Sequence, residues 1–300
     1  MVKLFLKGIG YLLGLLIFVT VGLWVYAKFK TDQFMTIPTF RTHQKQFVPP
    51  DTTEVYVLGL THKPTLKLSI DSLYNALELI KPDLILYEYD STGFDGEMRL
   101  KSKYAYVLPY FLSRFQSNEA TAFFKYLAFN PNTLIRPYEW NQRVDWHKKN
   151  DKAVGEMFDA IYKRYEAGKL STQHKVIVDD FNNLTRLLDG YIDSSIFVIN
   201  TLLPDSLAEL RQNCHYYQLA NIIKEDKYFE AFRDISNIKE QYWDVRNKAM
   251  AANICQFITL YPRKRIVILN GYFHRYYLRK ELIDKQANLN FKLLEINDLL

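Results

Sequence analysis

Two stretches near opposite ends of the chain, EVYVLGLTHKP at 54–64 and RIVILNGYFHR at 265–275, follow the same plan. In each, an apolar run ends in a glycine, and a histidine follows three positions later: Gly59 with His62, and Gly271 with His274. Glycine permits a tight turn and a close approach of another backbone. In open α/β sheets, ligands gather beyond the carboxyl ends of the strands. The repeat therefore predicts two strands that each deliver one histidine to the same edge of a sheet.

The residues around these stretches indicate an α/β fold. Apolar positions at helical spacing predict a helix over 65–81, and LILY at 84–87 reads as a second strand after the one at 54–58. A strand, a helix and a strand within about 35 residues predict parallel pairing with a right-handed crossover. Near the C-terminus, a strand ending at Leu269, a helix over 272–285 and a strand over 290–296 follow. We expect a central, mainly parallel sheet with flanking helices.

The middle of the chain, about 94–260, predicts a large helical insertion into the domain at 54–300. A short strand fits TLIRPYEW at 133–140. Glycine is favoured just after a helix end and in turns, so Gly168 is expected to end a helix and the Asp189-Gly190 pair to mark a turn.

The N-terminus carries an uncharged run of twenty residues at 8–27. About 20 apolar residues span a hydrocarbon core of roughly 30 Å. The run is longer than the apolar part of a typical signal peptide, about 7–15 residues. We therefore expect a retained transmembrane helix in an anchor at 1–30, in contact with the lipid bilayer, and a polar linker at 31–53.

The positive charges on the two sides of this run nearly balance, with Lys3 and Lys7 before it and Lys28 and Lys30 after it. The N-terminal amine adds to the first side, which favours a cytoplasmic N-terminus and an extracytoplasmic body on a single-pass anchor. A GxxxG pair at 10–14 would suit a homodimer.

The composition limits the function classes. A chain of 300 residues that is 48% hydrophobic can bury one large core. The net charge of +6 is spread along the chain without a basic tract, so no nucleic-acid partner is expected. Cys214 and Cys255 lie outside any CxxC pattern, and the sequence leaves open whether they form a disulfide.

A carboxylate joins the two histidines at the predicted sheet edge. Glu88 directly follows the second strand, so three strand ends offer two imidazoles and one carboxylate. Two His and one Glu form a known ligand set for a catalytic divalent metal that keeps one position open for water. Glu88 could instead stay off the metal as a general base. The alternative is that His62 and His274 are capping or surface residues and Glu88 a salt-bridge partner.

Arg246 is a fourth candidate because it lies in an apolar stripe. Tyr242, Met250 and Ile254 share its face of a predicted helix at four-residue spacing. A buried charge is costly without an anionic partner, and Glu88 or a carbonyl oxygen that gains charge during hydrolysis would serve. The alternative is a solvent-side salt bridge with a neighbouring acidic residue, Asp244 or Glu240. The stretch RPYEWNQRVDW at 136–146, which includes Glu139, either lines the pocket or simply starts a helix.

Four motifs, VLGLTH, KPDLILYEYD, DVRNKAMAANI and VILNGYFHR, resemble the successive motifs of the TraB/PrgY/Tiki superfamily, to which erythromycin esterases and ChaN-like proteins are distantly related. The resemblance covers about 54–297 and places the family pattern on Gly59/His62, Glu88, Arg246 and Gly271/His274. It implies a GxxH-motif metal-dependent hydrolase, a peptidase in the Tiki case. Leu60, Tyr272 and Phe273 depart from the smaller residues of many relatives and leave the substrate class open.

We therefore expect a membrane-anchored hydrolase that acts on a peptide or protein. His62, Glu88 and His274 would hold one divalent ion, for which zinc, manganese and cobalt all qualify, and Glu88 and Arg246 would be catalytic. The alternative is a non-catalytic module that sequesters a peptide, heme or metal at the same cleft.

Overall fold

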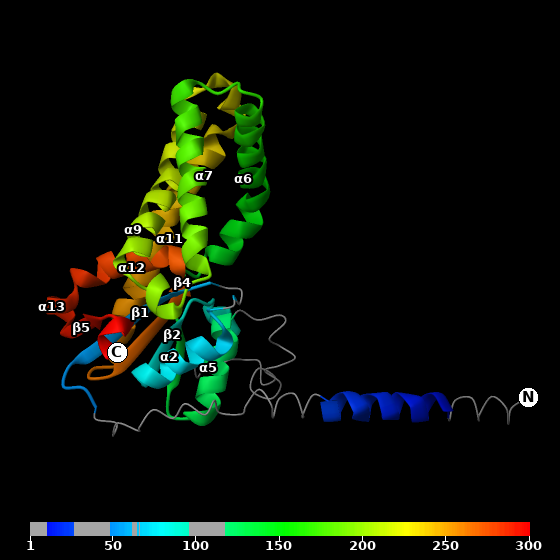
Figure 1. Ribbon diagram of the computed structural model, residues 1–300, viewed down its shortest axis with the longest axis vertical. Helices are drawn as coiled ribbons and strands as arrows, with labels where there is room; N and C mark the ends of the chain where they lie inside the picture. Colours follow the sequence, from blue (N-terminus) through cyan, green and yellow to red (C-terminus); the bar gives the residue numbers. More distant parts are fainter. Residues whose placement is uncertain (1–10, 27–48, 62–64, 66, 96–117) are drawn as a thin grey trace, which may run out of the picture.

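The computed structural model describes residues 11–26, 49–61, 65, 67–95 and 118–300, and it is an α/β protein (Figure 1). Its five strands form one sheet in the order β3-β2-β4-β1-β5, and every pair is parallel. The predicted parallel sheet is therefore confirmed. The strands are β1 (Thr53–Leu60), β2 (Leu84–Tyr87), β3 (Leu134–Pro137), β4 (Arg265–Gly271) and β5 (Phe291–Leu294).

Helices cover both faces of this sheet because alternate strand residues point to opposite sides. Tyr56, Leu58 and Leu269 belong to one core with α2 (Ile70–Ile80) and α5 (Asn118–Phe129). Val55, Val57 and Ile268 belong to the other core with the second half of α11 (Arg233–Leu260) and with α12 (Tyr272–Ile283). Both faces are thus buried, which explains the nearly continuous apolar strands.

The predicted helix at 65–81 is shorter in the structure. Ser69 caps α2 by accepting a hydrogen bond from the Ser72 amide, and Lys81 ends it in a left-handed conformation with φ 53°. The two capping residues therefore define where this helix begins and ends, whereas the apolar spacing alone predicted a longer helix.

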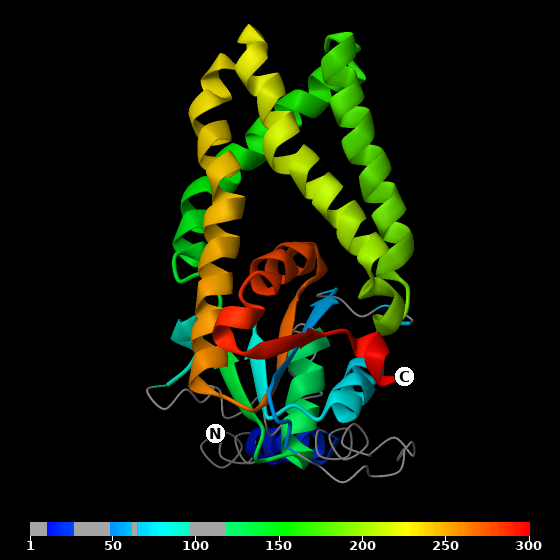
Figure 2. The ribbon, with the colours of Figure 1, turned by 90° about the vertical axis from the view of Figure 1, so that its left-hand side faces the viewer.

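The long helices rise from the end of the sheet where the strands finish (Figure 2). Met157, Val178 and Phe229 are among the residues of their separate apolar core. Besides α11, the helical insertion contains α6 (Arg143–Glu166), α7 (Thr172–Ile192), α8 (Ile196–Ile199), α9 (Leu202–Asn213), the π-helical turn η2 (Cys214–Gln218), α10 (Leu219–Glu225) and the 3₁₀ turn η3 (Lys227–Phe232).

Two details of the expected insertion differ from the structure. The range 94–260 includes α5 and β3, which pack with α2 and pair with β2, so the helices that leave the sheet begin with α6. Gly168 ends a helix as expected, with φ +65°. The turn predicted at Asp189-Gly190 is absent, because both residues lie inside α7, where Leu188 is buried and packing outweighs the weak helix propensity of glycine.

The N-terminal part is described over 11–26, which is one continuous helix with every residue exposed. Within the described ranges, no helix is both long enough and apolar enough to cross a membrane. The two ends of the predicted span at 8–27, and nearly all of the predicted linker at 31–53, lie outside the described residues.

Candidate functional site

The two Gly-x-x-His stretches lie on neighbouring strands, and their ends meet. In the pairing of β1 with β4, Gly59 lies opposite Asn270 and Leu60 opposite Gly271. On the other side of β4, Tyr87 of β2 lies opposite Leu269, so Glu88 follows at the same edge. The predicted convergence of the three strand ends is therefore present. His62 lies outside the described residues, and its meeting with His274 stays a prediction.

Gly59 on β1 contacts both the insertion and α12. A Cβ there would lie 3.0 Å from the Cα of Tyr272 and 3.1 Å from Cδ of Arg275, so only glycine leaves room. The buried side chain of Asn200, which follows α8, accepts a hydrogen bond from the Gly59 amide at 2.7 Å and donates one to its carbonyl at 3.2 Å. The insertion thus holds the last residues of β1 through Asn200.

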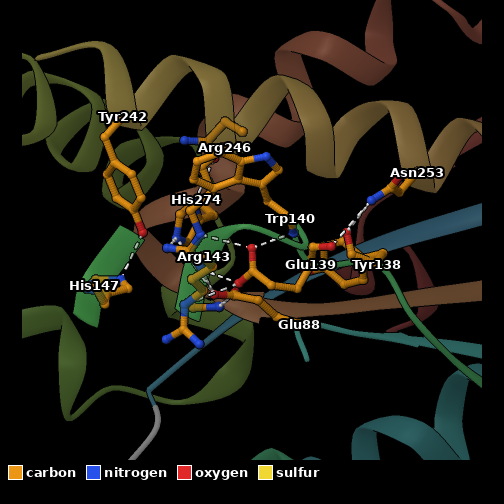
Figure 3. A network of polar contacts seen from close by, with 12 residues as sticks. Glu88, Tyr138, Glu139, Trp140, Arg143, His147, Tyr242, Arg246, Asn253 and His274 are labelled. Carbon is orange, nitrogen blue, oxygen red and sulfur yellow. Dashed lines mark hydrogen bonds and ion pairs between the residues drawn. The ribbon is translucent and has the colours of Figure 1, made fainter. Parts of the chain in front are cut away.

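Glu88 is held at the strand ends through both carboxylate oxygens. Oε2 accepts a hydrogen bond from the Gly271 amide at 2.7 Å, and Oε1 accepts one from Nη2 of Arg246 at 2.6 Å (Figure 3). The Glu88 amide donates to the carbonyl of Leu269 at 3.3 Å. The second glycine of the repeat therefore positions the carboxylate with its backbone.

Arg246 lies between two carboxylates in the interior, not on the solvent side of α11. Nε and Nη2 donate to the two oxygens of Glu139 at 3.0 and 2.5 Å, and Nη2 also donates to Glu88. Burial alone would lower the pKa of Arg246, but Glu88 and Glu139 outweigh burial and raise it above its ordinary value. The alternative partners are used elsewhere: Glu240 pairs with Lys224, and Asp244 accepts a hydrogen bond from Tyr277.

Glu139 is the residue that sequence reasoning left undecided. It follows β3, and its fully buried side chain also accepts a hydrogen bond from the Trp140 amide at 2.7 Å. The guanidinium of Arg143 lies near it, with Nε 3.5 Å from Oε2. The signal that could have identified Glu139 is the rule that pointed to Glu88, a carboxylate just beyond the end of a parallel strand.

His274 has a defined tautomer because its neighbour fixes one ring nitrogen. Asn247 donates from Nδ2 to the carbonyl of Trp243 at 2.7 Å, so its Oδ1 is the atom that faces Nδ1 of His274, also at 2.7 Å. Nδ1 therefore carries the proton, and Nε2 is an acceptor 3.0 Å from Nη1 of Arg246. The imidazole also stacks on Trp243, with ring centroids 4.5 Å apart. Asn247, next to Arg246 in sequence, was missed.

Two donors of the predicted metal site are described, and they fit a shared ion. Nε2 of His274 lies 3.7 Å from Oε1 of Glu88, within the about 4.2 Å that two ligands span when each is about 2.1 Å from one ion. The contact of Nδ1 with Asn247 is of the kind that metal-binding histidines usually make. Because Arg246 contacts the same lone pair, Nε2 can serve the guanidinium or an ion but not both at once.

The described part of the chain does not complete a metal site by itself. No group of three or more His, Cys, Asp or Glu suited to a metal occurs within it, and the third expected ligand, His62, lies outside it. Both cysteines are free thiols, Cys214 buried and Cys255 partly so, which answers the question of the disulfide.

Comparison of the chain with models of known protein families gave no match, and comparisons with curated proteins and with solved structures gave none either.

Proposed function

We propose that this chain is a hydrolase of the TraB/Tiki type that cleaves a peptide or protein at the carboxyl ends of β1, β2 and β4. The position of Arg246 carries the proposal, because a buried guanidinium there meets Glu88 and His274 at the edge where α/β sheets bind ligands. The resemblance supports the same residues, since three of its four motifs contribute a side chain to this cluster and the fourth, at Gly59, ends the adjacent strand.

The residues have separate roles in this proposal. Arg246 presents a planar set of donors to a carbonyl oxygen that gains negative charge. Glu139 keeps the guanidinium oriented through two hydrogen bonds when other contacts are exchanged for substrate. Glu88, whose Oε1 lies 3.7 Å from Nε2 of His274, is the base that would take a proton from an attacking water, and His274 serves as a metal ligand.

A divalent ion held by His62, Glu88 and His274 belongs to the proposal as its cofactor. When bound, such an ion polarises a carbonyl and lowers the pKa of a bound water towards about 7. Asn247 and Gly271 would then hold His274 and Glu88 in place, as they do in the described structure.

The test is peptide cleavage by the full-length protein in detergent, followed by mass spectrometry of a defined peptide pool. Replacement Arg246→Lys keeps the charge but loses the fork of donors, so we expect a loss of about tenfold or more with the fold intact. Arg186→Lys, at an exposed position on α7, serves as the control. Chelation should remove the activity, and one divalent metal should restore it.

A binding module at the same cleft is the second candidate. All three guanidinium nitrogens of Arg246 are already engaged by Glu139, His274 and Glu88, an arrangement that also suits a cluster that binds without turnover. Peptide binding without cleavage in the same assay would favour this candidate, and a folded Arg246→Lys variant with unchanged cleavage would remove Arg246 from the mechanism.

We also propose that residues 8–27 anchor the protein in a membrane with the body on the extracytoplasmic side. The support is the uncharged twenty-residue run of the sequence. Carbonate extraction should leave the full-length protein in the membrane fraction, whereas release of a soluble chain that begins near Lys28 would identify a cleaved signal.

A further inference from the structure

A cavity of about 270 Å³ lies between α9, η2, α11 and α12, and Trp243 and Tyr276 are among the residues that line it. None of its lining residues is Glu88, Glu139, Arg246 or His274, so it is separate from the strand-end cluster. Its size is just below the usual range of small-molecule sites, about 300–1,000 Å³. A ligand of this cavity is therefore a small one.

Aromatic side chains form the inner part of this cavity. Trp243 is stacked against Tyr216, with centroids 4.8 Å apart, and against His274. Its indole nitrogen donates to the hydroxyl of Tyr276 at 3.0 Å. Trp243 and Tyr276 are both buried, and Tyr217 and Tyr277 complete the aromatic lining. Because neighbouring contacts hold Trp243 and Tyr276, this wall is formed before any ligand arrives.

Carboxylates dominate the polar lining. Three of them, from Glu209, Asp244 and Glu281, face one ammonium, from Lys280, which is paired with Glu209. Asp244 accepts a hydrogen bond from the Tyr277 hydroxyl at 3.0 Å. Across the described ranges, neither Asp244 nor Glu281 forms an ion pair with a lysine or arginine. The cavity is thus negatively charged in a chain whose net charge is +6.

This combination selects one class of ligand. Aromatic rings attract cations to their electron-rich faces, and the carboxylates of Asp244 and Glu281 supply the opposite charge. An anion would be repelled, and an uncharged ligand would desolvate the carboxylates without a compensating partner. We propose that the cavity binds an organic amine, with its ammonium groups paired with Asp244 and Glu281 and its alkyl chain against the tyrosine and tryptophan rings.

The proposal does not depend on hydrolysis at the strand ends, and binding alone can test it. Spermidine is titrated calorimetrically into the full-length protein in detergent at low ionic strength, where charge attraction is least screened. The double variant Asp244→Asn, Glu281→Gln should bind roughly tenfold more weakly or worse, since both opposite charges are lost. The amide oxygen introduced at position 244 can still accept the Tyr277 hydrogen bond, so the variant keeps the local packing.

Two controls make the result specific. Glu156→Gln removes an exposed carboxylate on α6, far outside the lining, and should leave the affinity unchanged. The uncharged chain 1,8-octanediol should not bind. Spermidine that binds the wild type and the double variant equally, or octanediol that binds as well as spermidine, would overturn the proposal.

A second probe distinguishes a free amine from a basic side chain. The probe is a pentapeptide with blocked ends and one central lysine. Binding of spermidine alone indicates a free polyamine-like ligand, and binding of the peptide, with the same sensitivity to the double variant, indicates a lysine side chain of a protein or peptide. Absence of binding by both probes would contradict the assignment.

Discussion

Two buried cations lie on the same helix, α11, and the structure holds them in opposite ways. Arg246 is surrounded by carboxylates at the strand ends, and its pKa is raised. Lys239, two turns earlier in the helical insertion, donates to the carbonyl of His215 at 2.8 Å and lies over the rings of Tyr216 and Phe158. Within the described residues no carboxylate pairs with it, and burial, reinforced by Arg211, lowers its pKa to about 7.

The two regions differ in the groups that surround the buried cation: carboxylates at the proposed site, and aromatic rings in the apolar core of the insertion. At the strand ends, polar groups from three separate segments, Glu88, Glu139 and His274, offset the desolvation cost of Arg246 and leave it charged at every physiological pH. In the insertion, aromatic faces replace the carboxylates, so the charge on Lys239 is only weakly supported. Burial of a cation therefore does not by itself indicate a functional site, and the proposed site rests on the opposite charges that converge at the sheet edge.

The largest effect should follow the loss of Arg246. Replacement Arg246→Met leaves Glu88 and Glu139 buried without their common partner, and we expect the free energy of unfolding to fall by about 3–5 kcal/mol. Denaturant unfolding measures this change. Arg186→Met, on the exposed face of α7, should stay within about 0.5 kcal/mol of the wild type. A loss below about 1 kcal/mol for Arg246→Met would mean that the cluster is not energetically coupled.

Lys239 should instead affect how the free energy of unfolding depends on pH. Its pKa is about 7 in the folded state and ordinarily 10.5, so the unfolded chain binds the extra proton between these values. The free energy of unfolding of the wild type should therefore rise relative to Lys239→Met by about 2–3 kcal/mol from pH 7 to pH 9, at about 1.4 kcal/mol per pH unit.

The control for Lys239 is Lys248→Met, which removes an exposed lysine from the same helix. Its pH profile should run parallel to that of the wild type. A flat difference between wild type and Lys239→Met over the same pH range would show that the lysine keeps its proton in the folded protein.

A smaller change in stability is expected when one glycine from each region is replaced by alanine. Gly59→Ala brings a Cβ within 3.0 Å of the Tyr272 backbone and should cost about 1–3 kcal/mol, because neither β1 nor α12 can easily move. Gly155→Ala, on α6, meets nothing within 4 Å and should stabilise the protein by about 0.5–1 kcal/mol. Thermal unfolding of both variants checks the pair, and equal effects would remove the special role of Gly59.

The sequence predicted the parts of the fold that depend on local patterns. The β2 strand at 84–87 has the predicted limits, because an apolar run follows a proline and ends at a carboxylate. The contact between Arg246 and Glu88 was expected from helical spacing and from the end of that strand. Both inferences needed only periodicity and the rule that parallel strands end at one edge.

The rest of the cluster depends on long-range packing that no local pattern contains. Glu139 lies 107 positions from Arg246. The strand-end rule could place Glu139 at the sheet edge, but its pairing with Arg246 is visible only after folding. Asn247 could not be distinguished from other polar residues of its helix, because no local pattern relates it to the imidazole of His274, 27 residues away. The prediction of a turn at Asp189-Gly190 was wrong because tertiary packing of α7 overrides the local preference of these residues.

The most direct test of the account is the binding of one divalent ion by the two strand ends together. Zinc or manganese is titrated into metal-free, full-length protein by calorimetry, with variants His62→Ala, His274→Ala and the control His147→Ala, whose half-exposed ring pairs with Asp151. The account predicts one ion per chain, with affinity lowered about tenfold or more by His62→Ala and by His274→Ala and unchanged by His147→Ala. No ion bound by the wild type, or wild-type affinity in His62→Ala, would contradict it.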